Sequence, residues 1–171
     1  MKKTAVIFLS VLILLCSLSS CGETGVRPSC REILSAVTAA EIGLPAGKYY
    51  SLNAPKGDEE YLSNALIASI FGGGAYPEVA EDWVDVALYL SFGKSPCEFA
   101  VILCQNRDAA HDTAKLLCSR LSAIKIAKNS PEYETMIANA NVAVSGNYAL
   151  LIISSDPEIA MKIMRKQFGR Y

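Results

Sequence analysis

His111 is the only histidine in the 171-residue chain, so any cysteine–histidine or serine–histidine mechanism would have to use it. It falls on the polar side of an expected helix, one turn after Arg107 and one turn before Lys115. Cys118 follows two helical turns later, about 10 Å along the helix axis, which is too far for a direct pair. We therefore interpret His111 as a solvated surface residue and expect no catalytic residues.

Four cysteines remain once the N-terminal segment through Cys21 is set aside, and none of them has the paired spacing that a zinc site requires. We expect no metal and no cofactor. Cys104 ends an apolar segment and Cys118 lies beside a leucine on a helix, so both are interpreted as small buried hydrophobic residues. Cys30 and Cys97 fall at element boundaries, where they could be exposed and could form a disulfide, a question that the sequence leaves open.

An acidic, aromatic stretch offers the best candidate for a contact surface. Its acidic residues, Glu78, Glu81, Asp82 and Asp85, lack the spacing and the glycine of a calcium loop, so a solvated face is favoured over a metal site. Exposed aromatic residues often mark binding surfaces, although Trp83 could instead close the core. The residues of this possible binding surface are Tyr76, Glu78, Glu81, Asp82 and Trp83.

The N-terminus has the organisation of a lipoprotein signal peptide. Lys2 and Lys3 precede an apolar run over residues 5–16, and the segment Leu18-Ser19-Ser20-Cys21 resembles the lipobox of bacterial lipoproteins. A transmembrane anchor is disfavoured because about 20 apolar residues are needed to span a bilayer and no basic stop follows this shorter run. A simple cleaved signal peptide is the other alternative. We expect residues 1–20 to be removed and Cys21 to be lipidated.

Lipidation would hold the protein at the outer face of the bacterial cytoplasmic membrane, because two acyl chains on one cysteine give stable anchoring. Residues 21–29 would form a short tether, which keeps the domain close to the bilayer. The expected partners are therefore the membrane itself, through the lipid, and an envelope protein or a small ligand.

Composition supports one folded domain over residues 30–171. The chain is 51% hydrophobic and 19% charged, which suits a single core. Lys2 and Lys3 are the only charged residues of the first 20, so the rest carries 14 basic and 17 acidic residues, a formal charge of −3. A mildly acidic domain has no electrostatic reason to bind nucleic acid.

Hydrophobic periodicity predicts the elements of this domain. A helix is expected around residues 33–40, and a second one opening at residues 58–60 and ending at the glycines 72–74. Residues 84–92 alternate like a half-covered strand, whereas residues 98–104 are apolar on both faces. A long helix capped by Asn106, a shorter one over residues 130–140 and a last one from residue 156 complete the set, with a second hairpin over residues 142–144 and 148–153.

Residues 98–109 and 147–158 align without a gap, so the chain contains two β-hairpin–helix units. We therefore predict an α+β fold with a four-stranded sheet packed against N-terminal helices. Numbered along the chain, the strands take the order 1-2-4-3, which places the two apolar strands in the middle and the alternating ones at the edges. Val101 and Leu150 are equivalent and should both be buried against the helices that follow them. The relative direction of the central strands stays open.

The segment from about Cys30 to Lys166 resembles an uncharacterised lipoprotein family of Gram-positive anaerobes that carries one domain of unknown function. The likeness rests on the lipobox, on Glu98-Phe99-Ala100-Val101, and above all on residues 146–154, Gly-Asn-Tyr-Ala-Leu-Leu-Ile-Ile-Ser, followed by the Asp156-Pro157 helix start. Cys97 and the glycines 72–74 depart from the pattern. The resemblance implies a fold and an address but no activity.

The leading functional hypothesis is a non-catalytic, membrane-tethered extracytoplasmic domain that binds a partner or ligand. The alternative is an enzyme, a hydrolase or thiol enzyme that acts on envelope material, which would need His111, a cysteine or two carboxylates converging in one cleft. A structural accessory subunit of a membrane complex is the third possibility.

Overall fold

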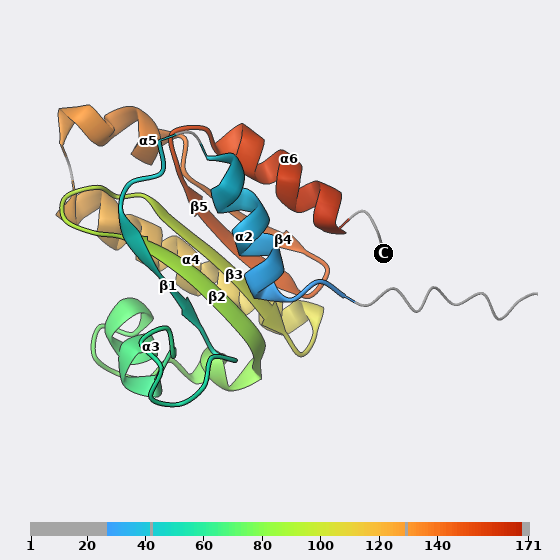
Figure 1. Cartoon of the computed structure of the whole chain (residues 1–171). Coiled ribbons are helices and arrows are strands. Elements are labelled where there is room, and N and C mark those ends of the chain that lie inside the picture. Colours follow the sequence, from blue (N-terminus) through green and yellow to red (C-terminus); the bar gives the residue numbers. More distant parts are fainter. Residues whose placement is uncertain (1–26, 42, 129, 169–171) are drawn as a thin grey trace, which may run out of the picture.

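The computed structural model describes residues 27–41, 43–128 and 130–168 as a five-stranded antiparallel sheet with helices on both faces (Figure 1). The sheet order is β1-β2-β3-β5-β4. The strands are β1 (Gly47–Ser51), β2 (Trp83–Ser91), β3 (Glu98–Cys104), β4 (Asn141–Ser145) and β5 (Tyr148–Ile153). The helices are α2 (Cys30–Ala40), α3 (Asn64–Phe71), α4 (Arg107–Ala127), α5 (Glu134–Ala138) and α6 (Pro157–Phe168), with short 3₁₀ helices over Glu78–Asp82 and Pro131–Tyr133.

The α+β class is confirmed, but the prediction of four strands is wrong in its detail. The expected hairpins are present as β2-β3 and β4-β5, and β3 lies beside β5. A fifth strand, β1, pairs antiparallel with β2, so β2 lies inside the sheet instead of at its edge. The sequence Gly-Lys-Tyr-Tyr-Ser gives no alternating pattern over its five residues, and for this reason β1 was not anticipated.

The two central strands run antiparallel, which the sequence had left open. Val101 of β3 lies directly opposite Leu150 of β5, and Ala100 lies opposite Leu151. Successive side chains of a strand point to opposite faces, so the first pair lies on one face of the sheet and the second pair on the other.

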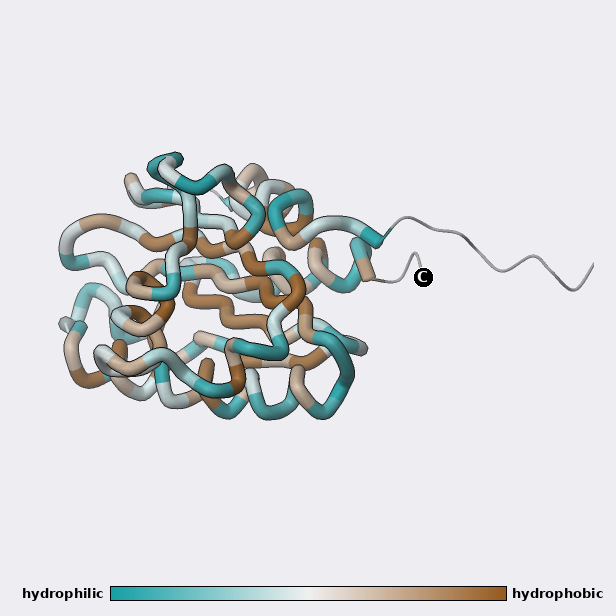
Figure 2. The backbone as a smooth tube through the Cα atoms, turned by 90° about the horizontal axis from the view of Figure 1, so that it is seen from below, coloured by the Kyte–Doolittle hydropathy of each residue, from teal (hydrophilic) through white to brown (hydrophobic). Residues whose placement is uncertain are grey.

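The two β-hairpin–helix units send their helices to opposite faces of the sheet. Figure 1 shows α4 behind the strands, with α2 and α6 in front of them. One core cluster joins α3 and α4 to the face that carries Leu88, Ile102 and Leu151. The other joins α2 and α6 to the face that carries Tyr89, Val101 and Leu150. Figure 2 shows the hydrophobic strands in the middle of the molecule and the more hydrophilic segments around them.

Strand β2 is buried on both faces, so its interpretation as half-covered is wrong. Val86 and Leu88 pack toward α3 and α4, whereas Ala87 and Tyr89 pack toward α2. The alternation of larger apolar residues with other types predicted one covered face. The other face is covered too, because Tyr89 and the small Ala87 are core residues, 3% and 0% exposed.

The helix starts follow from local capping. Ser29 and Glu32 form a capping box at the start of α2, and the Asn106 side chain accepts a hydrogen bond of 2.9 Å from the Ala109 amide at the start of α4, as expected. Helix α3 begins at Asn64 after the cap Ser63, not at residues 58–60. Those residues form turns instead, because the Asp58 carboxylate accepts the Glu60 amide at 2.8 Å.

The second hairpin turns at Gly146, whose φ of 57° places it in the left-handed region. A glycine at the first central position, followed by a residue of negative φ, is the pattern of a type II′ turn. Asp156 then accepts a hydrogen bond of 3.1 Å from the Ile159 amide and caps α6. These local contacts position α6 alongside β4 and β5.

Candidate functional site

Four of the five residues of the expected binding surface lie at the surface, around the 3₁₀ helix Glu78–Asp82. Tyr76 is 39% exposed, and its hydroxyl donates to the Ala80 carbonyl at 3.3 Å. Glu78 and Glu81 are exposed and Asp82 is half-buried. The four pockets described below have no lining residue from this segment.

Of the two roles open to Trp83, the structure shows the core role. Its side chain is 7% exposed and packs edge-to-face on Phe71, with ring centroids 5.6 Å apart. The indole Nε1 donates to the Thr113 hydroxyl of α4 at 2.9 Å, which satisfies its one donor inside the core. The Trp83 side chain is therefore not accessible to a binding partner.

The burial of the cysteines differs from the expectation. Cys30 and Cys97 are buried and Cys118 is exposed, while Cys104 is buried as predicted; all four are free thiols, so Cys30 and Cys97 form no disulfide. Burial raises the pKa of Cys97 to about 12 and raises the pKa values of Cys30 and Cys104 as well. A thiol that stays protonated at neutral pH is a poor nucleophile.

His111 and Cys118 both lie exposed on α4, as the helical pattern predicts for His111. Within the described ranges, no group of three or more His, Cys, Asp and Glu side chains is arranged to hold a metal ion. His111 therefore belongs to no such group among the described residues.

A polar cleft of about 360 Å³ lies where α2 begins, between β1, β2 and the 53–60 loop. Asp85 is buried on its floor, where its carboxylate accepts hydrogen bonds of 2.8 Å from the Cys30 amide and 2.8 Å from the Asn53 side chain. The negative charge sits at the N-terminus of α2, where the helix dipole favours it. Asp85 was expected on a solvated acidic face, and its burial was not foreseen.

Arg31 crosses the same cleft. Its guanidinium pairs with Glu60 at 2.9 Å and lies over the Tyr49 ring, 4.7 Å from the centroid. The Nη1 atom of Arg31 is buried without a hydrogen-bond partner among the described residues. Asp58 also lines this cleft, so three carboxylates and one arginine converge there. Each carboxylate already has a structural partner, which favours a role in holding α2 and the loop in place.

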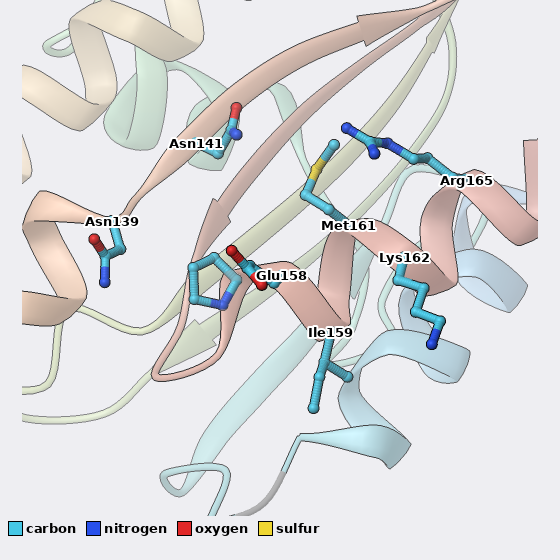
Figure 3. Close-up of a pocket in the computed structure, with 8 residues that line it drawn as sticks. Asn139, Asn141, Glu158, Ile159, Met161, Lys162 and Arg165 are labelled. Atoms are coloured by element: carbon cyan, nitrogen blue, oxygen red, sulfur yellow. The ribbon is translucent and has the colours of Figure 1, made fainter.

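The second and longer candidate is a groove between the edge strand β4 and helix α6, which we call the β4–α6 groove. Its residues line three pockets along the strand. The widest, about 980 Å³, lies between the start of β4 and the start of α6 (Figure 3). A smaller pocket of about 190 Å³ lies deeper, and a third of about 290 Å³ lies at the Gly146 turn, beside Phe168 and Arg27.

Six of the eight residues that line the small pocket are apolar, and the other two are Ser145 and Arg165. Its floor comes from the sheet and its roof from α6, and its lining residues are Ala143, Val144, Ser145, Leu150, Met161, Met164, Arg165 and Phe168. Met161 and Arg165 also line the wide pocket, so the two pockets adjoin at these side chains. In Figure 3, Met161 and Arg165 extend from one side of α6 while Ile159 and Lys162 extend from the other.

The sequence alone does not indicate this groove, although its elements were predicted. Glu158, Met161, Arg165 and Phe168 recur at helical spacing, which places them along one flank of α6. This flank adjoins the apolar stripe of α6, so the sequence pattern does not separate the two. The small Ala143 in a short edge strand, opposite two methionines, is the signal that could have indicated a cavity.

Comparison of the chain with protein-family models, with curated proteins and with solved structures found no match. The resemblance to a lipoprotein family therefore stays a prediction. In the part of the chain that the structure describes, no helix is both long enough and apolar enough to cross a membrane. Cys21 and the signal peptide lie outside the described residues.

Proposed function

We propose that this protein is a lipid-anchored domain on the outer face of the bacterial cytoplasmic membrane that binds an envelope partner without catalysing a reaction. The observation that carries the binding role is the β4–α6 groove, in which an edge strand, an apolar pocket and a cationic side chain lie together. The lipobox sequence ending at Cys21 supports the address. An accessory subunit of a membrane complex would use the same groove.

The absence of a catalytic role is supported by the chemistry of the candidate groups. The thiols of Cys30, Cys97 and Cys104 have raised pKa values because they are buried, and His111 is exposed on α4. The surface formed by Tyr76, Glu78, Glu81 and Asp82 stays a proposal for a second contact area.

A second candidate function, a carboxylate-based hydrolase of envelope material, is favoured by the convergence of Asp58, Glu60 and Asp85 in the polar cleft. Its test is turnover of peptidoglycan fragments by the purified protein. Activity that disappears in Glu60→Gln, with an unchanged melting temperature, would support this candidate and contradict the binding role as the sole function.

Replacement of Cys21 by Ala tests the anchoring. We expect the wild-type protein to be labelled by radioactive palmitate and to be processed in a globomycin-sensitive manner, and the Cys21→Ala variant to lose both properties and membrane retention together. An alanine variant that still sediments with membranes after a high-salt wash would show that the lipid is not the anchor.

A further inference from the structure

Strand β4 has an open edge. Among the residues that the structure describes it pairs with β5 on one side only, and in an antiparallel ladder the backbone N–H and C=O groups of every second residue point away from the partner strand. Its sequence, Asn-Val-Ala-Val-Ser, contains no charge and no proline, which are the usual means of blunting such an edge.

The opposite edge of the sheet is protected. Strand β1 carries Lys48, whose ammonium group lies 3.4 Å from the Glu59 carboxylate, and Ser51 forms an isolated bridge with Tyr61. The two edges thus differ in a way that leaves β4 as the edge suited to strand addition.

The small pocket beside β4 has room for a guest side chain. Ala143 points toward α6 and fills little of the space beneath Met161 and Met164, which leaves the pocket of about 190 Å³. A strand added to β4 would lie about 4.8 Å outside it, with its side chains on the α6 face directed into this pocket. An unbranched or γ-branched apolar side chain such as Met or Leu fits there.

Arg165 lies at the mouth of the pocket and makes no ion pair with a described residue. Alternate residues of a strand share a face and lie about 7 Å apart, so a carboxylate two residues from the apolar side chain could reach this guanidinium. Glu158, two helical turns before Arg165, lines the other end of the groove beside Asn141 and would repel a carboxylate there. A strand that adds antiparallel to β4 starts at the Ser145 end, near Arg165, and runs toward Asn141. Its carboxylate therefore comes before its apolar residue in the sequence.

A second copy of this chain fits the groove less well. Two β4 edges could pair, but the residues of β4 that point toward α6 are Asn141, Ala143 and Ser145, which are too small to fill the pocket. A foreign segment with a larger apolar side chain fills it.

We propose that the β4–α6 groove binds an extended segment of an envelope protein, which adds to β4 as a sixth strand and presents a carboxylate and then, two residues later, an apolar side chain to α6. This proposal rests on the proposed binding function and specifies its ligand. Backbone hydrogen bonds to β4 would supply affinity, and the pocket and Arg165 would supply specificity.

The test uses the full lipidated chain in phospholipid nanodiscs and a fluorescent capped peptide of sequence Thr-Glu-Thr-Leu-Thr-Val-Thr. We expect Arg165→Glu to weaken binding about tenfold or more, equivalent to about 1.4 kcal/mol. Lys166→Glu, the same charge reversal one residue along and outside the pocket lining, should change binding less than about twofold. A peptide with Lys in place of Glu should bind Arg165→Glu better than it binds the wild type.

Ala143→Leu tests the pocket separately, because the new side chain fills the cavity from the strand side. It should abolish binding of the peptide without lowering the melting temperature. Hydrogen exchange should slow at β4 amides when the peptide binds to the wild type. Equal binding by wild type, Arg165→Glu and Ala143→Leu would overturn the proposal.

Two further outcomes would also overturn it in a distinguishable way. If sedimentation showed that Ala143→Leu changes self-association instead of peptide binding, the occupant would be a second copy of the chain. If a crosslinker at Asn141 captured an envelope partner in cells while the peptide failed to bind, the ligand chemistry proposed here would be wrong and the binding function would stand.

Discussion

Val101 and Leu150 lie directly opposite each other across β3 and β5, and both are buried, at 0% and 1% exposure. Both belong to the face of the sheet that α2 and α6 cover. The expectation that each would pack on the helix that follows it therefore holds for Leu150 and α6. It is wrong for Val101, because α4 covers the other face.

The Val101–Leu150 pair predicts a large stability contrast. Val101→Ala should lower the free energy of unfolding by about 1 to 3 kcal/mol and Leu150→Ala by about 2 to 4 kcal/mol, since each change loses transfer energy and leaves a cavity. Val84→Ala is the matched control, because Val84 is 52% exposed. Its change should stay within about 0.5 kcal/mol. Urea denaturation measures all three, and a Val84→Ala cost equal to that of Val101→Ala would refute the burial described here.

The Glu98–Arg120 ion pair should matter more than any surface pair. Glu98 is 4% exposed, and Arg120 of α4 donates to both of its carboxylate oxygens, at 3.1 and 2.8 Å. Glu98→Gln should lower the free energy of unfolding by about 2 to 4 kcal/mol, because it leaves the partly buried guanidinium without a counter-charge. Asp112→Asn removes the exposed pair with Lys115 and should cost less than about 0.5 kcal/mol. Similar denaturation midpoints for the two variants would contradict this assignment.

The buried thiol of Cys97 predicts a loss of stability at alkaline pH. Burial raises its pKa from an ordinary value of 9.0 to about 12 in the folded protein. The stability that this difference represents is fully present below pH 9 and is lost as the pH rises from 9 to 12, by up to about 1.4 kcal/mol per pH unit. Cys97→Ala should have a flatter stability profile over that range. Identical slopes for the variant and the wild type would show that Cys97 does not titrate on unfolding.

His111→Ala should leave the melting temperature and partner binding nearly unchanged, because His111 is exposed on α4 and lines none of the four pockets. Calorimetry and the peptide-binding measurement check the two properties together. Loss of function with an unaltered melting curve would instead favour an enzyme that uses this histidine.

The sequence predicted the parts of the fold that depend on local pattern. The continuous apolar runs of β3 and β5, the Asn106 cap and the Gly146 turn each carry a strong local signal, and each is found. The start of α3 was misplaced because Asp58 and Glu60, which suit a helix N-terminus, hydrogen-bond in a turn instead.

The candidate sites depend on long-range contacts that local pattern does not contain. From the sequence alone, Asp85 looks like a solvated acidic residue. Its structural role arises only in the fold, where the Cys30 amide at the start of α2 lies 2.8 Å from its carboxylate. The β4–α6 groove likewise arises only when α6 crosses beside the edge strand, so that Ala143 and Met161 face one pocket. The sequence allows both a surface and a core role for Trp83 and favours the core, where Thr113 is the partner of its indole.

Site-directed photocrosslinking in cells tests most directly whether the β4–α6 groove is the contact surface. A photoreactive residue would replace Asn141 in the groove, Glu81 on the sequence-predicted surface, or Ser122 on the exposed side of α4. We expect a crosslinked envelope partner from position 141 that is absent from position 122 and disappears in Ala143→Leu. Crosslinking from position 81 with none from position 141 would show that the β4–α6 groove is not the contact surface.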